Sequence, residues 1–232
     1  MANNEEKLVF LDDLPETYSL EVPAGENKTL RLVALKQLPA KLHLVVNVHR
    51  DALFRGAFVD FTDVSTELDL QVNLLEEGAQ CDWHLAVLSH GKANKSFSTS
   101  VKHIAPHTQA LMSNYGIARE QSHLVFTGTS AIEHGAVKAN TRQEAKIIVF
   151  DPGANGLASP ILLIGENDVQ ASHAAVVGRL NEDHLFYLES RGVSEEDAKR
   201  LIALGYLKPI ERYYDDPALV EKIDAVIEGE IA

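Results

Sequence analysis

Ten short segments in which apolar and polar residues alternate follow one another from Thr29 to about Val177. They read TLRLVAL, KLHLVVNVHR, AFVDF, ELDLQVNLL, DWHLAVLSH, SFSTSVKHI, QALMSNYGI, HLVFTGTSAI, KIIVF and ILLIG. Alternation with a period of two is typical of half-buried β-strands, and no long stripe with helical spacing interrupts the series. The residues between the segments are mainly Gly, Asn, Asp, Ser and Thr, which favour turns. The pattern therefore predicts a mainly β fold.

A sandwich, a barrel and a solenoid are all compatible with this pattern. The segments have similar lengths and few Asn-Gly or Asp-Gly hairpin turns separate them, which favours the stacked turns of a solenoid. The repeat is degenerate, however, and the sequence contains no hexapeptide or Asp-Gly-rich signature. The alternation alone leaves the three architectures open.

The pattern changes to a helical one at Asn181. Asn181 is a candidate N-cap for a helix that ends near Gly192. The residues SEED at 194–197 have the form of a capping box with Asp at its last position, and the helix that they open is expected to stop at Gly205. Asp216-Pro217 is expected to open a third helix. The chain is thus divided into a lead-in over 1–28, a β core over 29–180 and a C-terminal helical domain over 181–232.

Composition narrows the function classes. The chain has 232 residues, 45% of them hydrophobic, and a formal net charge of −13, which argues against nucleic acid as a partner. Cys81 is its one cysteine, so an internal disulfide or a thiolate-only cluster site is excluded. The first sixteen residues are acidic rather than leader-like, and no apolar run approaches the ~20 residues of a membrane span. A cytoplasmic protein without a membrane partner is expected.

One histidine interrupts an apolar stripe in DVQASHAAVVGRL at 168–180. Alternation places His173 on the same strand face as Val169, Ala171, Ala175 and Val177. A histidine in such a place is most simply a core or rim residue with its nitrogens satisfied by the backbone. The alternative is an imidazole that serves as a metal ligand or a proton carrier at the end of the β-structure.

Other candidate sites have less support. His103 and His107 have the spacing HxxxH, but in a β-strand residues four apart lie about 13 Å from each other. These two, with His84 and His90, are therefore expected to be surface or turn histidines. The acidic and basic residues between 50 and 63 suggest a carbohydrate lyase or hydrolase on a β-solenoid as an alternative function. Polar residues facing outward on alternating strands would explain that cluster equally well.

The segment from Ser159 to Leu207 resembles the C-terminal signature of the SufB/SufD family of iron–sulfur cluster assembly proteins. The family pattern is a strand of the form DV–SH–ATVG, followed by LFYL–SRG and a helix that ends near GF or GY. The matching residues are Asp168-Val169, Ser172-His173, Val177-Gly178-Arg179, Leu185-Phe186-Tyr187-Leu188, Ser190-Arg191-Gly192 and Gly205-Tyr206. Three upstream stretches, LDLQVNLLEEGAQ, SVKHIAPHTQA and VFTGTSAIEHGAVKANTRQEAK, also resemble the β-region of the family, so the resemblance covers about residues 65–232.

This resemblance implies a right-handed parallel β-helix with a small C-terminal α-helical domain. It also implies a non-enzymatic scaffold subunit that pairs through its β-helix with a SufB-like subunit or with itself. The helical domain would dock a SufC-type ATPase, for which the candidate contacts are Phe186, Tyr187, Arg191 and Tyr206. No cofactor is expected to bind stably to this chain alone. His173 would lie at the subunit junction, where iron or a nascent cluster is handled transiently.

Two features make the chain resemble the SufD branch of the family rather than the SufB branch, and two others distinguish it from typical SufD proteins. SufB-type chains have a glutamate directly after the histidine and a cysteine on a preceding strand, whereas this chain has Ala174 and no such cysteine. Compared with full-length members, most of the N-terminal region is missing. Some SufD proteins also have a cysteine before the Ser-His pair, where this chain has Ala171. Sulfur ligands for a cluster would then have to come from another subunit.

Overall fold

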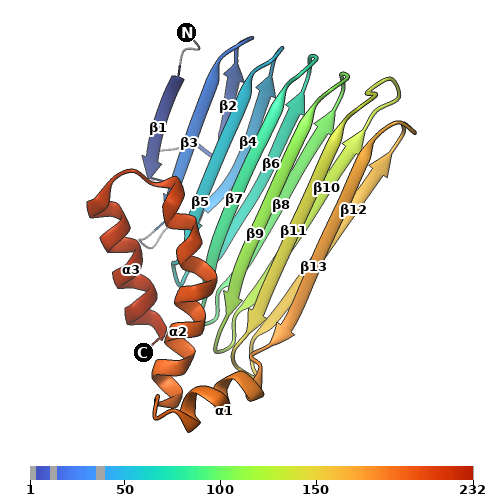
Figure 1. The fold of residues 1–232 in the computed structure, drawn as a ribbon. Helices are drawn as coiled ribbons and strands as arrows, with labels where there is room; N and C mark the ends of the chain where they lie inside the picture. The colour runs from blue at the N-terminus through green and yellow to red at the C-terminus, as the bar shows by residue number, and fades with distance from the viewer. Residues whose placement is uncertain (1–3, 11–14, 35–39, 232) are drawn as a thin grey trace.

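The computed structural model describes residues 4–10, 15–34 and 40–231. Within these residues, thirteen strands are assigned alternately to two sheets (Figure 1). Odd-numbered strands form one sheet in the order β1-β3-β5-β7-β9-β11-β13, and even-numbered strands form the other in the order β12-β10-β8-β6-β4-β2. The strands are β1 (Asn4–Phe10), β2 (Thr17–Val22), β3 (Asn27–Ala34), β4 (Ala40–Val48), β5 (Leu53–Asp60), β6 (Thr66–Leu74), β7 (Gln80–Ser89), β8 (Asn94–His103), β9 (Gln109–Ala118), β10 (His123–Ile132), β11 (Asn140–Val149), β12 (Asn155–Ile164) and β13 (Gln170–Arg179). We call these the odd sheet and the even sheet.

Every strand pairs in parallel with the strand one turn of the chain away. Each turn therefore adds one strand to each sheet, which defines a β-solenoid and confirms the predicted fold class. Sandwich and closed-barrel alternatives are excluded by this topology. The predicted domain ranges remain a prediction; within the first of them, β1 and β2 already pair with β3 and β4.

One turn position recurs in five successive rungs, before β3, β5, β7, β9 and β11. It is occupied by residues with positive φ, namely Gly25, Asp51, Gly78, His107 and Lys138. Each donates its backbone N–H to a carbonyl oxygen in the same turn of the next rung, over 2.7–3.3 Å. The left-handed conformation suits Gly, and Asp tolerates it better than most other residues do. The spacing lengthens from 26 residues between the first two positions to 31 between the last two.

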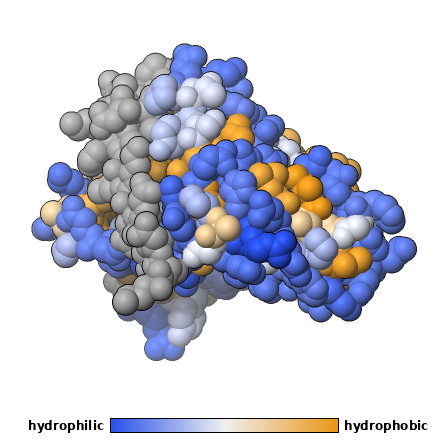
Figure 2. Space-filling view, turned by 90° about the horizontal axis from the view of Figure 1, so that it is seen from above, coloured by the Kyte–Doolittle hydropathy of each residue, from blue (hydrophilic) through white to orange (hydrophobic). Residues whose placement is uncertain are grey.

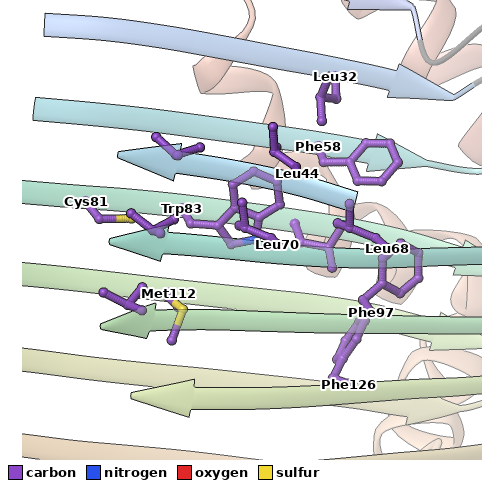
Figure 3. Close-up of a cluster of buried hydrophobic side chains, with 14 of the residues drawn as sticks. Leu32, Leu44, Phe58, Leu68, Leu70, Cys81, Trp83, Phe97, Met112 and Phe126 are labelled. Atoms are coloured by element: carbon purple, nitrogen blue, oxygen red, sulfur yellow. The ribbon is translucent and has the colours of Figure 1, made fainter. Parts of the chain in front are cut away.

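The space between the sheets is filled by alternate side chains of both. On β8, for example, the buried positions alternate with more exposed ones along the whole strand. Trp83 of β7 lies at the centre of this interior, in register with Gly56 of β5 on one side and Met112 of β9 on the other. Figure 3 shows Trp83 among the leucine and phenylalanine side chains of both sheets. A Cβ on Gly56 would lie 2.3 Å from the Trp83 ring, so the indole occupies the space that a glycine leaves.

Three α-helices and a 3-10 helix follow the last strand: α1 (Glu182–Ser190), α2 (Glu195–Leu207), η2 (Lys208–Tyr213) and α3 (Pro217–Ile231). The predicted caps are confirmed, because Asn181 Oδ1 accepts the N–H of Asp183 and Ser194 Oγ accepts the N–H of Asp197. Gly205 as a stop was wrong. The helix continues through it to Leu207, and Pro209 lies in the tighter turn that follows.

The helices cover part of the outer face of the odd sheet, in front of its first strands (Figure 1). A second hydrophobic core lies between them, in which Ala86 and Leu88 of β7 meet Leu207, Ile223 and other helical residues. Tyr214 also donates its hydroxyl to the carbonyl oxygen of Leu32 over 2.8 Å. Strands β5 and β7 are thus buried on both faces, whereas β13 is not covered at all.

Candidate functional site

The last rung of the solenoid, β12 and β13, has a neighbouring strand on one side only. β12 pairs with β10, and β13 pairs with β11, so each forms a free edge of its sheet. Nine of the ten residues of β13 are exposed. Natural proteins rarely leave a long regular edge strand bare, because its unpaired backbone groups can pair with another chain. This free edge of β12 and β13 is the candidate site.

His173 lies in the middle of this edge. Its Cα is in register with that of Gln143 on β11, which is in turn in register with Met112 and Trp83. The histidine therefore continues a column of side chains from the solenoid interior, as the alternation predicted, yet its position is exposed because no rung covers it. This exposure excludes a core position for His173 and agrees with the rim position that the first interpretation also allowed.

Gln143 closes the interior directly beneath His173. Its Nε2 donates to Ser130 Oγ over 2.7 Å and to the carbonyl oxygen of Ile161 over 3.1 Å, so it joins the odd sheet to β10 and β12. Its Oε1 has no hydrogen-bond partner in the described structure. Gln143 was not among the residues predicted from the sequence. It lies just upstream of KIIVF in the same strand, and the alternation of that strand could have indicated that its polar side chain points inward.

The backbone of β13 presents alternate N–H groups to the free edge. Gln170 and Leu180 donate their N–H groups back to Ala139 and Val149, at the start and at the end of the strand. In a parallel ladder such donors recur at every second residue, so the even-numbered residues of β13 bond to β11. The odd-numbered residues, His173 among them, point their N–H and C=O groups away from the solenoid.

Apolar side chains surround this edge. The largest exposed fractions along it belong to Leu157, Leu163 and Val176, at 56%, 57% and 53%. Ile161, Ile164 and Val177 are exposed beside them. The space-filling view shows hydrophobic patches among hydrophilic residues at the centre and right of the view (Figure 2). A contiguous apolar surface of this kind typically marks a protein–protein contact.

A second exposed apolar group lies on the helices. Phe186 and Tyr187 of α1 are 72% and 58% exposed, and Leu201 of α2 is 52% exposed. The Arg191 guanidinium lies 5.2 Å from the centre of the Tyr187 ring. Tyr206 differs from these residues, because it is half-buried and packs edge-on against Tyr115 of β9.

The other titratable candidates are dispersed. His103 and His84 are buried, which corrects their prediction as surface or turn residues, whereas His107 does lie in a turn. Burial lowers the pKa of His103 to about 4, so it is neutral inside the solenoid. Burial likewise raises the pKa of the Cys81 thiol far above its usual range, which keeps it an unreactive core residue.

Two acidic residues of the cluster at 50–63, Asp51 and Asp60, lie at opposite ends of β5. Asp60 is buried and its Oδ1 accepts a hydrogen bond from Lys95 Nζ over 2.6 Å, whereas Asp51 lies in a turn. The burial of Asp60 corrects the expectation that the polar residues of this cluster face outward. Among the described residues, no group of three or more His, Cys, Asp or Glu side chains could hold a metal ion. No described helix is long and apolar enough to cross a membrane.

The structure thus defines the chain as a parallel β-solenoid protein with C-terminal helices, in which the last rung is a bare edge that carries a histidine. Residues 17–206 match the family model "SUF system FeS cluster assembly, SufBD core domain", and the chain belongs to this family. It is SufD-like. The SufD iron–sulfur cluster assembly protein of Bacillus subtilis is 32% identical over 91% of this chain and 49% of its own length.

Two further relatives match shorter stretches. A SufBD family protein of Staphylococcus epidermidis is 26% identical over 60% of this chain and 30% of its own length. The SufB protein of Bacillus subtilis is 27% identical over 47% of this chain and 24% of its own length. The chain thus spans about half the length, or less, of the curated relatives that it matches.

Proposed function

We propose that this chain is a non-enzymatic scaffold subunit of the SUF iron–sulfur cluster assembly system. In this proposal, the free edge of β12 and β13 pairs with the β-helix of a SufB-like subunit or of a second copy. The observation that carries the proposal is the exposure of β13 along its whole length, with His173 at its centre. Family membership supports the assignment to this system, because the family model is named for SUF cluster assembly.

Strand pairing at β13 can be tested with a proline at a residue whose N–H points away from the solenoid. We expect Ala175→Pro to leave the ladder with β11 intact, because proline removes only an N–H that faces the free edge. The ring would block the approach of a partner strand and weaken association by at least about tenfold. Analytical ultracentrifugation should measure the dissociation constant, for the chain alone and with a SufB-like subunit.

The neighbouring residue provides the matched control. Ala174→Pro removes an N–H that bonds to β11, so this variant is expected to melt at a lower temperature than Ala175→Pro. If Ala175→Pro folds normally and associates as tightly as the unmodified chain with both partners, pairing at this edge is wrong.

We further propose that His173 is one ligand for iron or a nascent cluster at the subunit junction. Imidazole is a suitable iron ligand, but one side chain cannot hold the ion alone. Cys81 is buried and lies on β7, three strands from β13 in the odd sheet, so thiolate ligands would come from the partner. The cluster is the cargo of this assembly rather than a resident cofactor of the chain.

The ligand role predicts different outcomes for different replacements of His173. In a complex co-expressed with its partner subunits, His173→Ala is expected to lower bound iron by at least about tenfold. His173→Cys should retain part of it, because a thiolate also binds iron. The melting temperature should change little, since the side chain is exposed. Unchanged iron content, or a large loss of stability instead, would contradict the ligand role.

The exposed residues of α1 are proposed to dock an ATPase subunit of the SufC type. Phe186→Ser combined with Tyr187→Ser is expected to weaken this binding by about 2 kcal/mol or more, because exposed aromatic residues often dominate an interface. Isothermal titration calorimetry with the ATPase should measure the loss. Leu157→Ser removes a similarly exposed apolar residue at the free edge and should leave ATPase binding unchanged. Equal effects of both changes would argue against a separate docking surface.

A further inference from the structure

A groove lies on the outer face of the odd sheet, at the border of the helices. It has a volume of about 510 Å³, and its floor consists of outward-facing residues of β7, β9 and β11, including Leu111 and Ser113. One wall consists of α2 and η2, with Gly205, Leu207 and Arg212. Pockets that bind small molecules commonly have volumes of ~300–1,000 Å³. The groove lies on a different face from the free edge of β12 and β13.

Two pairs of aromatic rings are among the residues that line this groove. Tyr213 stacks on His84 with a centroid distance of 4.0 Å and an interplanar angle of 20°. Tyr206 meets Tyr115 edge-on, with ring centroids 5.8 Å apart. Burial raises the pKa of Tyr206 and of Tyr213, so both phenols stay neutral at physiological pH. The groove therefore offers fixed, uncharged aromatic surfaces.

The carboxylates in and beside the groove are already engaged. Asp82 Oδ1 lies 2.7 Å from His84 Nε2, which orients the buried imidazole. Glu144 Oε2 accepts the Tyr115 hydroxyl over 3.0 Å, and its other oxygen pairs with Arg142. Glu144 is thus paired with a cation, and Asp82 is not among the residues that line the groove.

Two cations next to the rings, Arg212 and Lys146, form no direct ion pair in the part of the chain that the structure describes, although Asp82 and Glu144 interact with them at longer range. Arg212 lies with its guanidinium carbon 4.8 Å from the centre of the Tyr213 ring and donates to the Tyr213 hydroxyl over 2.7 Å. Lys146 Nζ lies 5.2 Å from the centre of the Tyr115 ring. The residues that line the groove include the cations Arg142 and Arg212 and one carboxylate, Glu144, so the lining is locally basic in a chain whose net charge is −13.

We propose that this groove binds a small organic anion with a planar aromatic body. The body contacts Tyr115, Tyr206 and Tyr213, and its anionic group lies against Arg212. A flat ring system suits these tyrosines, because it can make the offset or edge-on contacts that aromatic pairs prefer. The Arg212 guanidinium, which forms no direct ion pair in the described structure, suits a sulfonate, carboxylate or phosphate group, with which it can form bidentate hydrogen bonds.

Two helical glycines allow a matched test. A Cβ at Gly205, which lines the groove, or at Gly229, which lies elsewhere on α3, would meet no atom within 4 Å. Leucine is also a better helix former than glycine, so both Gly205→Leu and Gly229→Leu are expected to fold. Only the first substitution places a side chain in the groove.

The probe is 8-anilinonaphthalene-1-sulfonate, an aromatic anion with a planar naphthalene ring system, whose fluorescence rises on binding. Gly205→Leu is expected to weaken its saturable binding by at least about tenfold, whereas Gly229→Leu leaves it unchanged. Arg212→Gln should weaken binding of this anion but not of N-phenyl-1-naphthylamine, which has the same rings without the sulfonate. Equal affinity of Gly205→Leu and Gly229→Leu would show that the probe binds elsewhere and overturn the proposal. Equal loss of both probes in Arg212→Gln would overturn the preference for an anion.

Discussion

Replacement of Lys95 by methionine is expected to destabilise the protein by about 3–5 kcal/mol, because it leaves a buried carboxylate without its counter-charge. Lys95 and Asp60 are both fully buried. Lys95 Nζ also donates to Thr62 Oγ1 and to the carbonyl oxygen of Leu88, over 3.2 and 3.3 Å. The network joins β8 of the even sheet to the end of β5 of the odd sheet. Urea unfolding of the Lys95→Met variant, followed by far-ultraviolet circular dichroism, measures the loss.

A double variant distinguishes the net contribution of the Asp60–Lys95 pair to the free energy of unfolding from the loss caused by leaving one charge buried alone. Burial lowers the pKa of Lys95 despite the nearby carboxylate, which indicates that the ammonium is expensive to desolvate. Asp60→Asn combined with Lys95→Met removes both charges, and the amide oxygen can still accept the N–H of Thr62. We expect the double variant to regain most of the stability lost by Lys95→Met. A loss equal to the sum of the two single losses would show that the charges do not interact.

Truncation of Trp83 to alanine is expected to cost about 3–5 kcal/mol, the usual range for a buried aromatic residue. Trp83 is fully buried between the sheets. Gly56, its neighbour in register, has no side chain that could fill the cavity. Because Trp83 is also the chain's one tryptophan, unfolding of this variant has to be followed by circular dichroism rather than by fluorescence.

The effect of a methyl group at Gly56 should depend on Trp83. In the unmodified chain, Gly56→Ala puts a Cβ within 2.3 Å of the indole, and overpacking of this kind commonly costs about 1–3 kcal/mol. In the Trp83→Ala background the same methyl group enters empty space, and we expect it to be neutral or stabilising. Additive effects of the two substitutions would contradict the direct packing of the indole on Gly56.

Much of the fold could be predicted from the sequence, because its local signals agree with the tertiary structure. The alternating segments are strands, and the caps at Asn181 and Ser194 start helices where the residue pattern predicts them. Gly205 failed as a stop signal because a glycine ends a helix only where the chain turns left-handed. Here α2 continues to Leu207, which the second core buries.

The solenoid itself was harder to predict because its repeat is a matter of backbone geometry more than of residue identity. One turn position holds Gly, Asp, Gly, His and Lys in successive rungs, and their spacing varies. His103 and Asp60 were misjudged for a related reason. Alternation gives the phase of a strand but does not reveal which polar residues find a buried partner, as Asp60 finds Lys95 from 35 residues away. The inward phase of His173 was predictable; its exposure follows from its place in the final rung.

The bare edge of the odd sheet also limits how such a protein can assemble. A parallel sheet has a direction, so head-to-tail stacking of copies would offer a new edge after each addition and would grow into a filament. Two edges that meet about a twofold axis, or an approximate one, satisfy each other and leave no strand for a third chain at that seam. An assembly closed in this way stops at two, with both copies of β13 side by side at its centre.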